Sequence, residues 1–500
     1  MTEPSDPEAE ARREPSLLQS LVPVLVLMGL LAASVYLYGA DSSQGPNQIA
    51  LILAAGVGIV LGLANGYSWR ELEQGIVQGI SLSMGALLIL LVVGSLIGTW
   101  ILAGIVPTMI YYGLQVLSPS IFLAAACVIC ALVSLATGSS WTTVSTVGIA
   151  LIGIATAQEV HLGLTAGAII SGSYFGDKMS PLSDTTNLAP AMAGTELFVH
   201  IHHMVWTTGP SILLAIVLFA VVGLTGARPE QAANLGPMLA TLQGSFSIGP
   251  HLLVPPALVL LFVWRRMPAF PALLLGALIG GLFAVLFQQQ TVLAFVGETQ
   301  HPRWLALLQG FWTALYAGFS LDSGNPSIDD LLSRGGMASM LTTVWLIITA
   351  MIFGAVMETT RMLHRLAATI LGFARGTGSL IGATLATSVG ANIIASDQYI
   401  AIVLPGRMFR SEYARRGLAP QNLSRALEDA GTLTSPLVPW NTCGAFMAQT
   451  LGVATFTYLP FCFFNLINPV VSAIYGATGF TIVRATEPAP GSAADRALSG

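Results

Sequence analysis

The chain has 500 residues, of which 54% are hydrophobic and only 9% are charged, whereas a soluble domain carries about 25% charged residues. This composition excludes an ordinary soluble protein, and the net charge of −5 gives no support to a nucleic-acid partner. We therefore expect an all-α polytopic membrane protein whose surroundings are the lipid bilayer.

Apolar runs recur along almost the whole chain, and a membrane span needs roughly 20 such residues. They predict one integral membrane domain over residues 17–480. Residues 1–16 are polar and acidic, unlike the basic start of a cleaved signal peptide, and we expect a disordered cytoplasmic segment there. Residues 481–500 are rich in Ala, Pro, Gly and Ser and are also predicted to be disordered. The predicted spans are 17–39, 47–65, 81–104, 119–136, 144–158, 162–175, 206–226, 250–264, 268–288, 338–358, 366–387, 391–405, 433–453 and 456–478.

Two parts of the chain, roughly 81–226 and 338–478, echo each other and predict an internal repeat. In each part an apolar run breaks into small polar residues, and a segment rich in Gly, Ser, Thr and Pro follows later. Paired interruptions of this kind are typical of a transporter's binding site, because broken helices expose backbone polar groups at mid-membrane. The matched landmarks are Ser134-Leu-Ala-Thr137 with Thr384-Leu-Ala-Thr387, and Ser180-Pro-Leu182 with Ser435-Pro-Leu437.

The loops of the two copies differ in charge. The loop between Arg407 and Arg425 is rich in arginine, whereas its counterpart at 157–163 contains Glu159 and His161 and no arginine. Under the positive-inside rule the arginine-rich loop is cytoplasmic and the other loop faces outward. Equivalent loops on opposite sides predict an inverted repeat.

Lys178 is the only lysine in the chain, and it lies in a polar segment beside Asp177 and Asp184. An arginine stays charged under ordinary conditions, whereas a buried lysine can lose its proton. Ionisable groups at membrane depth are costly and usually functional. We expect Lys178 to favour the charged form of Asp177, or to discharge when a cation arrives.

Carboxylate, hydroxyl and amide oxygens crowd the polar segments, and hard cations prefer oxygen ligands. A buried carboxylate can also be neutralised by a proton, so one site can hold H+ or Na+ in turn. Asp177, Asp184 and Asp397 are the predicted Na+ ligands. The other predicted binding residues are Thr137, Ser139, Lys178, Ser180, Thr185, Thr186 and Asn187 in the first copy, and Asn392, Ser396, Asp429, Thr432, Thr434, Ser435, Asn441 and Thr442 in the second.

Signatures of enzymes and cofactors are missing from the sequence. It contains no Walker A loop, zinc signature or nucleophile elbow. We therefore expect neither enzymatic activity nor a cofactor.

The same polar segments resemble the NhaC-type sodium/proton antiporter family, within the ion-transporter superfamily. The resemblance extends from about residue 20 to 480 and is carried by 172–190, 328–336, 392–399 and 427–442. It implies re-entrant hairpins, a scaffold with a moving transport domain, and a homodimer.

The function expected first is exchange of Na+ for H+ by alternating access in a bacterial-type cytoplasmic membrane, with both ions competing for buried carboxylates. The alternative is a Na+- or H+-coupled carrier of an organic acid or amino acid, for example in malate/lactate exchange. Lys178 would then pair with a substrate carboxylate, and Trp141 and Trp440 would line a pocket or simply pack. A channel or sensor is a third class, but a two-copy broken-helix site suits alternating access better.

Overall fold

The apolar runs form helices, as expected where the bilayer offers the backbone no hydrogen-bonding partners. The computed structural model describes residues 13–226, 235–324 and 326–485. Within those ranges, nine helices are long and apolar enough to cross a membrane, or up to eleven if each of two bent pairs is one span. The predicted all-helical polytopic architecture is confirmed.

The helices have the following bounds. They are α1 (Leu17–Tyr38), α2 (Pro46–Ala64), α3 (Trp69–Leu102), α4 (Ile105–Val116), α5 (Pro119–Thr137), α6 (Ser140–Thr143), α7 (Ile149–Ala157), α8 (Leu162–Met179), α9 (Asp184–Ala193), α10 (Leu197–Gly226), α12 (Leu235–Ser245), α13 (Val254–Trp264), α14 (Ala269–Phe287), α15 (Gln289–Val296), α16 (Arg303–Tyr316), α17 (Pro326–Leu332), α18 (Leu341–Thr359), α19 (Met362–Gly372), α20 (Thr377–Ile394), α21 (Gln398–Arg415), α22 (Pro420–Leu427), α23 (Thr442–Leu451), α24 (Thr455–Tyr458) and α25 (Phe463–Thr478). Two π-helical turns, Val144–Gly148 (η3) and Glu428–Thr432 (η6), extend α6 and α22.

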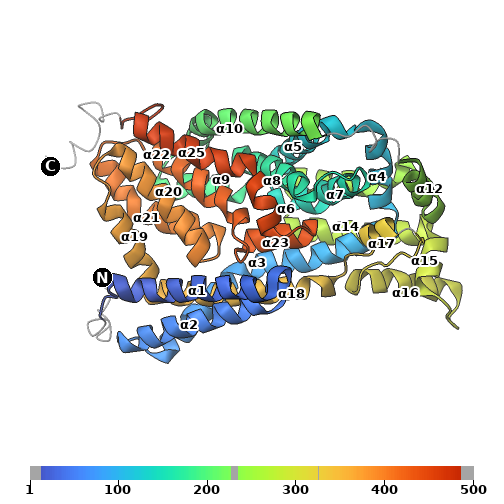
Figure 1. The fold of residues 1–500 in the computed structure, drawn as a ribbon, viewed down its shortest axis with the longest axis horizontal. Helices are drawn as coiled ribbons and strands as arrows, with labels where there is room; N and C mark the ends of the chain where they lie inside the picture. Colours follow the sequence, from blue (N-terminus) through green and yellow to red (C-terminus); the bar gives the residue numbers. More distant parts are fainter. Residues whose placement is uncertain (1–12, 227–234, 325, 486–500) are drawn as a thin grey trace, which may run out of the picture.

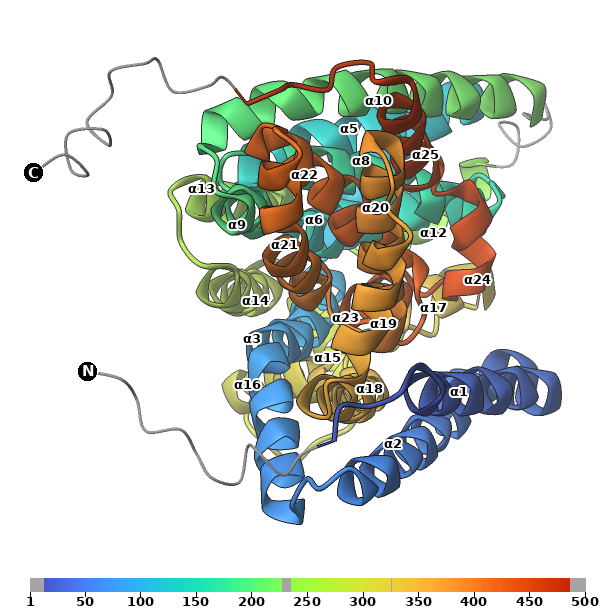
Figure 2. The same ribbon diagram turned by 90° about the vertical axis from the view of Figure 1, so that its left-hand side faces the viewer.

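In the view of Figure 1 the long helices α1, α3 and α10 run roughly across the molecule, and the turned view shows that α10 crosses α14 and α18 (Figure 2). The helices α1, α2, α3 and α18 pack together on one side, and α10 runs along the opposite side against α5 and α25 (Figure 2). The shorter elements α6, α8, α9 and α23 lie between these two sides (Figure 1). One end of the molecule carries α19, α20, α21 and α22, and the other end carries α12, α15 and α16.

Three predicted spans were wrong. The stretch 366–387 contains the end of α19 and the start of α20, and 391–405 crosses the break between α20 and α21. The stretch 433–453 crosses the irregular turn that precedes α23. At the break before α21, Ser396 has φ +59° and the side chain of Asp397 caps the next helix. The break between α19 and α20 contains Arg375 and Gly376, which the predicted span overlooked. Between α20 and α21 only Ser396 and Asp397 interrupt the apolar stretch, so hydropathy averaged over a span could not locate that break.

The described parts of the two chain ends also differ from the predicted disorder. Ser16 caps α1, and the Arg13 amide donates to the Asn65 carbonyl at 3.0 Å. The Ala485 amide donates to the Gly417 carbonyl at 2.9 Å. Residues 1–12 and 486–500 lie outside the described part of the chain.

Helices of the two predicted copies begin at a constant spacing of 258 residues. The pairs of starting residues are 119 and 377, 162 and 420, and 184 and 442. Two hydrogen bonds occur at positions that differ by the same spacing. The Ser134 hydroxyl donates to the Ser173 carbonyl, and the side-chain amide of Asn392 donates to the Gly431 carbonyl. The two sequence landmarks are spaced differently (134 and 384, 180 and 435), so they do not mark equivalent positions.

The helices α5 and α8 approach closely at glycine. A methyl group on Gly172 would overlap the Cys127 carbonyl oxygen, and one on Gly176 would overlap the Leu135 amide nitrogen. Small residues four apart allow membrane helices to pack backbone against backbone. This packing fixes the last turn of α8, where Asp177 and Lys178 lie.

Candidate functional site

Two helix breaks inside the molecule define the candidate site. After α5, Gly138 adopts φ +71° and Ser139 caps α6, which continues through η3 and α7 to Ala157. After α20, Ser396 and Asp397 form the corresponding break before α21. Each break leaves a helix N-terminus inside the protein, where free amide groups attract negative charge.

Asp177 occupies the first of these N-termini. Its Oδ2 accepts hydrogen bonds from the Ser140 hydroxyl at 2.6 Å and from the Ser140 amide at 3.3 Å. Its Oδ1 accepts from the Ser183 hydroxyl at 2.6 Å. The residue is only 8% exposed, so α6, α8 and the start of α9 meet on one buried carboxylate.

Lys178 binds a different carboxylate from the one expected. Its Nζ lies 2.5 Å from Asp429 Oδ1, and both side chains are fully buried. The Thr207 hydroxyl donates to the same oxygen at 3.0 Å. Lys178 therefore links α8 to η6 in the second copy, and the expected pairing with Asp177 is replaced by this long-range ion pair.

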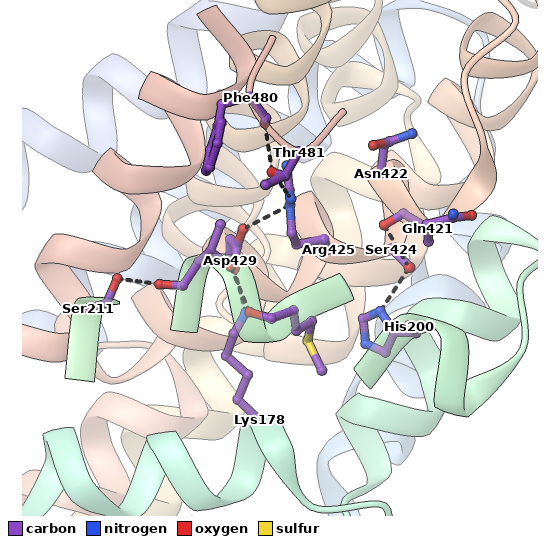
Figure 3. A network of polar contacts seen from close by, with 12 residues as sticks. Lys178, His200, Ser211, Gln421, Asn422, Ser424, Arg425, Asp429, Phe480 and Thr481 are labelled. Atoms are coloured by element: carbon purple, nitrogen blue, oxygen red, sulfur yellow. Dashed lines mark hydrogen bonds and ion pairs between the residues drawn. The ribbon is translucent and has the colours of Figure 1, made fainter. Parts of the chain in front are cut away.

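Arg425 extends this ion pair into a network. Its Nε lies 3.9 Å from Asp429 Oδ2, and its Nη1 donates to the Thr481 hydroxyl at 2.8 Å. Figure 3 shows Lys178, Asp429, Arg425 and Thr481 as one connected set. Two buried cationic groups thus surround a single buried carboxylate.

The second break is held mainly by amide side chains. Asn392 Nδ2 donates to the Gly431 carbonyl at 2.7 Å and to the Thr434 hydroxyl at 3.0 Å. Asn441 Nδ2 donates to Asn392 Oδ1 at 3.1 Å. Asp397 Oδ1 accepts from the amides of Tyr399 and Ile400 at 2.8 and 3.1 Å. Asp397 therefore has a helix-capping role in this structure.

Ser435 occupies the position 258 residues after Asp177, and Gln398 the position 258 residues after Ser140. The Ser435 hydroxyl donates to Gln398 Oε1 at 2.8 Å, so the pair repeats the Ser140–Asp177 contact without its charge. Gln398 was missed in the sequence because nothing there marks it as buried.

The remaining predicted residues divide into buried and exposed sets. Thr186 is buried and donates to the backbone carbonyls of Asp177 and Lys178, whereas Asp184 and Asn187 are exposed on α9. The carboxylates do not gather into a cluster of three or more metal-ligating side chains within the described ranges. A Na+ site here would therefore need hydroxyl or carbonyl oxygens as well. The other buried members are Thr137, Ser180, Thr185, Thr432, and Thr442, whose backbone amide donates to the Ser396 carbonyl. Ser139, the cap of α6, is partly exposed.

The two tryptophans expected either to line a pocket or to pack are both engaged in packing. Trp141 stacks on Phe446 with ring centroids 3.9 Å apart, and Trp440 Nε1 donates to the Ile393 carbonyl at 2.8 Å. A cavity of about 1000 Å³ is lined by residues of α12, α14, α15 and α16, by Gln288 between α14 and α15, and by the segment 319–322. None of the predicted site residues lines it.

A polytopic helical protein with two broken helices and buried ionisable groups between them is a multi-pass membrane transporter by its architecture. The model of the Na+/H+ antiporter family matches residues 172–480, and the chain belongs to this family.

Relatives support the same assignment over most of the chain. The Na(+)/H(+) antiporter NhaC of Alkalihalophilus pseudofirmus is 37% identical over 91% of this chain and 94% of its own. The NhaC of Bacillus subtilis is 38% identical over 82% of this chain and 88% of its own. The malate-2H(+)/Na(+)-lactate antiporter of Bacillus subtilis is 36% identical over 92% of this chain and 95% of its own.

Proposed function

We propose that this protein exchanges Na+ for H+ across a bacterial-type cytoplasmic membrane. The observation that carries the proposal is the environment of Asp177. Its two oxygens accept hydrogen bonds from two serine hydroxyls and a backbone amide at the N-terminus of α6, and the nearby lysine pairs elsewhere. A carboxylate held in this way is poised to bind a small cation or a proton.

Competition for Asp177 couples the two ions. Na+ would bind the carboxylate together with hydroxyl oxygens of Ser140, Ser183 and Thr185, since Ser183 Oγ and Thr185 Oγ1 lie 3.2 Å apart. A proton on the same carboxylate removes the charge that holds Na+. Each ion therefore leaves as the other binds, and no covalent chemistry is needed.

Alternating access requires two arrangements around this site. We propose that the elements spaced by 258 residues form an inverted repeat, with α1, α2, α3 and α18 in a scaffold and the broken helices in a moving domain. The arginine-rich stretch 407–425 belongs mainly to α21 and α22 and not to a loop, and it would face the cytoplasm. We further propose that two copies of the chain form a homodimer.

The alternative function is Na+-coupled exchange of organic acids, and it is favoured by the similarity to a malate/lactate antiporter. In that case the Lys178 ammonium would bind a substrate carboxylate. The ammonium is fully buried and already bound to Asp429, so a substrate would have to displace that carboxylate. Exchange of the inorganic ions is therefore the preferred proposal.

The test is Asp177→Asn in purified protein reconstituted into liposomes. The amide keeps the shape of the side chain but cannot be ionised, so we expect Na+/H+ exchange to be abolished. Asp41→Asn is the matched control, because Asp41 is exposed in the turn between α1 and α2, and exchange should be unchanged. Wild-type rates in Asp177→Asn would rule out this site.

A further inference from the structure

Glu428 is a buried acid that the proposed mechanism does not yet use. It is the first residue of the π-helical turn η6 and is 0% exposed. Neither of its carboxyl oxygens has a hydrogen-bond partner within the described part of the chain. Burying an ionised carboxylate without a partner costs several kcal/mol, so such a group either holds a proton or binds a cation.

The nearby cationic side chains are bound to other groups. Lys178 lies against Asp429 at 2.5 Å, and Arg425 binds Thr481 and approaches the other oxygen of Asp429. Both cationic groups therefore lie beside Asp429, and no ion pair joins either of them to Asp177 or Glu428 among the described residues. A monovalent cation or a proton can supply the missing positive charge at these two carboxyl groups.

Hydroxyl groups from both copies surround Glu428. The side chains of Thr185 on α9 and Thr432 on η6 lie close to its carboxylate, without a well-formed hydrogen bond to it. The Thr432 hydroxyl is itself buried and has no partner among the described residues. The Thr185 hydroxyl is within hydrogen-bond distance of the Ser183 hydroxyl, which donates to Asp177. A chain of hydroxyl oxygens therefore lies between the carboxyl groups of Glu428 and Asp177.

We propose that Glu428 is a ligand of the transported cation, together with the hydroxyls of Thr185 and Thr432. Oxygen ligands of this kind suit a hard cation such as Na+. The cation would lie between the first-copy carboxylate, Asp177, and the second-copy carboxylate, Glu428. This inference rests on the proposed exchange of cations and names a second carboxylate for the same site.

The test is Glu428→Gln, which keeps the size of the side chain and removes its charge. We expect the Na+ concentration for half-maximal exchange in proteoliposomes to rise by about tenfold or more, as for metal sites that lose a supporting group. Binding of radioactive sodium to the purified protein should weaken in parallel. The matched control is Glu73→Gln in α3, whose side chain is exposed, and it should leave both values unchanged.

A structural role and a ligand role predict different results. Restoring the carboxylate with Glu428→Asp should recover part of the Na+ affinity if Glu428 is a ligand. Unchanged Na+ affinity in a folded Glu428→Gln protein would overturn the inference. If that variant does not fold, Thr432→Val takes its place, and unchanged Na+ affinity in it would overturn the inference equally.

The inference and the proposed function fail in distinguishable ways. Loss of exchange in Asp177→Asn with normal Na+ affinity in Glu428→Gln would overturn the Glu428 inference alone. Wild-type protein without Na+-dependent proton movement would overturn the proposed function. In that case, sodium binding that is lost in Glu428→Gln would still support the ligand role, and equal binding would overturn it.

Discussion

At the scale of single residues, the ion pair of Lys178 and Asp429 joins two parts of the chain that are 251 positions apart. Both side chains are fully buried. Removing one partner of a buried pair leaves the other charge uncompensated, which is more costly than losing the pair as a whole. The contribution of this pair to the free energy of unfolding can therefore be measured without a transport assay.

Lys178→Met should lower the free energy of unfolding by about 3 kcal/mol, near the low end for a broken buried pair. We expect the low end because Arg425 lies 3.9 Å from the other oxygen of Asp429 and compensates in part. Adding Asp429→Asn should recover at least part of the loss. The measurement is the unfolding midpoint in detergent, and simple addition of the two single losses would contradict the pairing.

At the scale of elements, hydropathy predicts the bounds of several spanning helices, as for α1, α2, α5 and α14, but it misses short helices such as α4 and α16. The break at Gly138 lies within the polar interruption seen in the sequence. The break before α21 could not be located, because Ser396 and Asp397 interrupt an otherwise apolar stretch without Gly or Pro. Composition marks where polar residues occur but does not tell which face of a helix they occupy.

Prediction of the site was limited because the sequence does not tell which face of a helix a polar residue occupies. Asp177 and its serine neighbours lie in conspicuous polar motifs, and the structure brings them together. Asp184 lies in the same motif but is exposed on α9. The partner of Lys178 is set by packing between distant segments, which no local pattern reveals.

Glycine substitutions test the contact between α5 and α8. In Gly172→Ala the new methyl group meets the backbone of Cys127, so we expect a loss of about 1–3 kcal/mol from overpacking. Gly390→Ala in α20 meets no atom within 4 Å and should stabilise by roughly 0.5–1 kcal/mol, because alanine favours a helix interior. The unfolding midpoints of the two variants should therefore shift in opposite directions, and equal shifts would contradict the packing.

At the scale of the whole molecule, the arrangement separates an arginine-rich end from the end that carries α12, α15 and α16 (Figure 1). The positive-inside rule places the arginine-rich end in the cytoplasm. The four cysteines are all free and buried, so the wild-type protein should react little with a membrane-impermeant thiol reagent. Single exposed cysteines can then report which side each end faces.

Ser411→Cys at the end of α21 and Glu298→Cys after α15 place thiols at exposed positions on the two ends. In intact cells the reagent should label Glu298→Cys and spare Ser411→Cys. Inside-out vesicles should give the reverse pattern. Labelling of both positions from one side would contradict the proposed orientation.

The central claim is that a buried carboxylate site exchanges Na+ for H+ with no other solute involved. The most direct measurement uses wild-type protein in liposomes that contain a trapped pH dye, with an imposed Na+ gradient and no organic solute. We predict a change of internal pH that depends on Na+ and reverses when the gradient is reversed. A correctly folded and inserted protein that gives no pH change would contradict the account and would favour a Na+-coupled organic substrate.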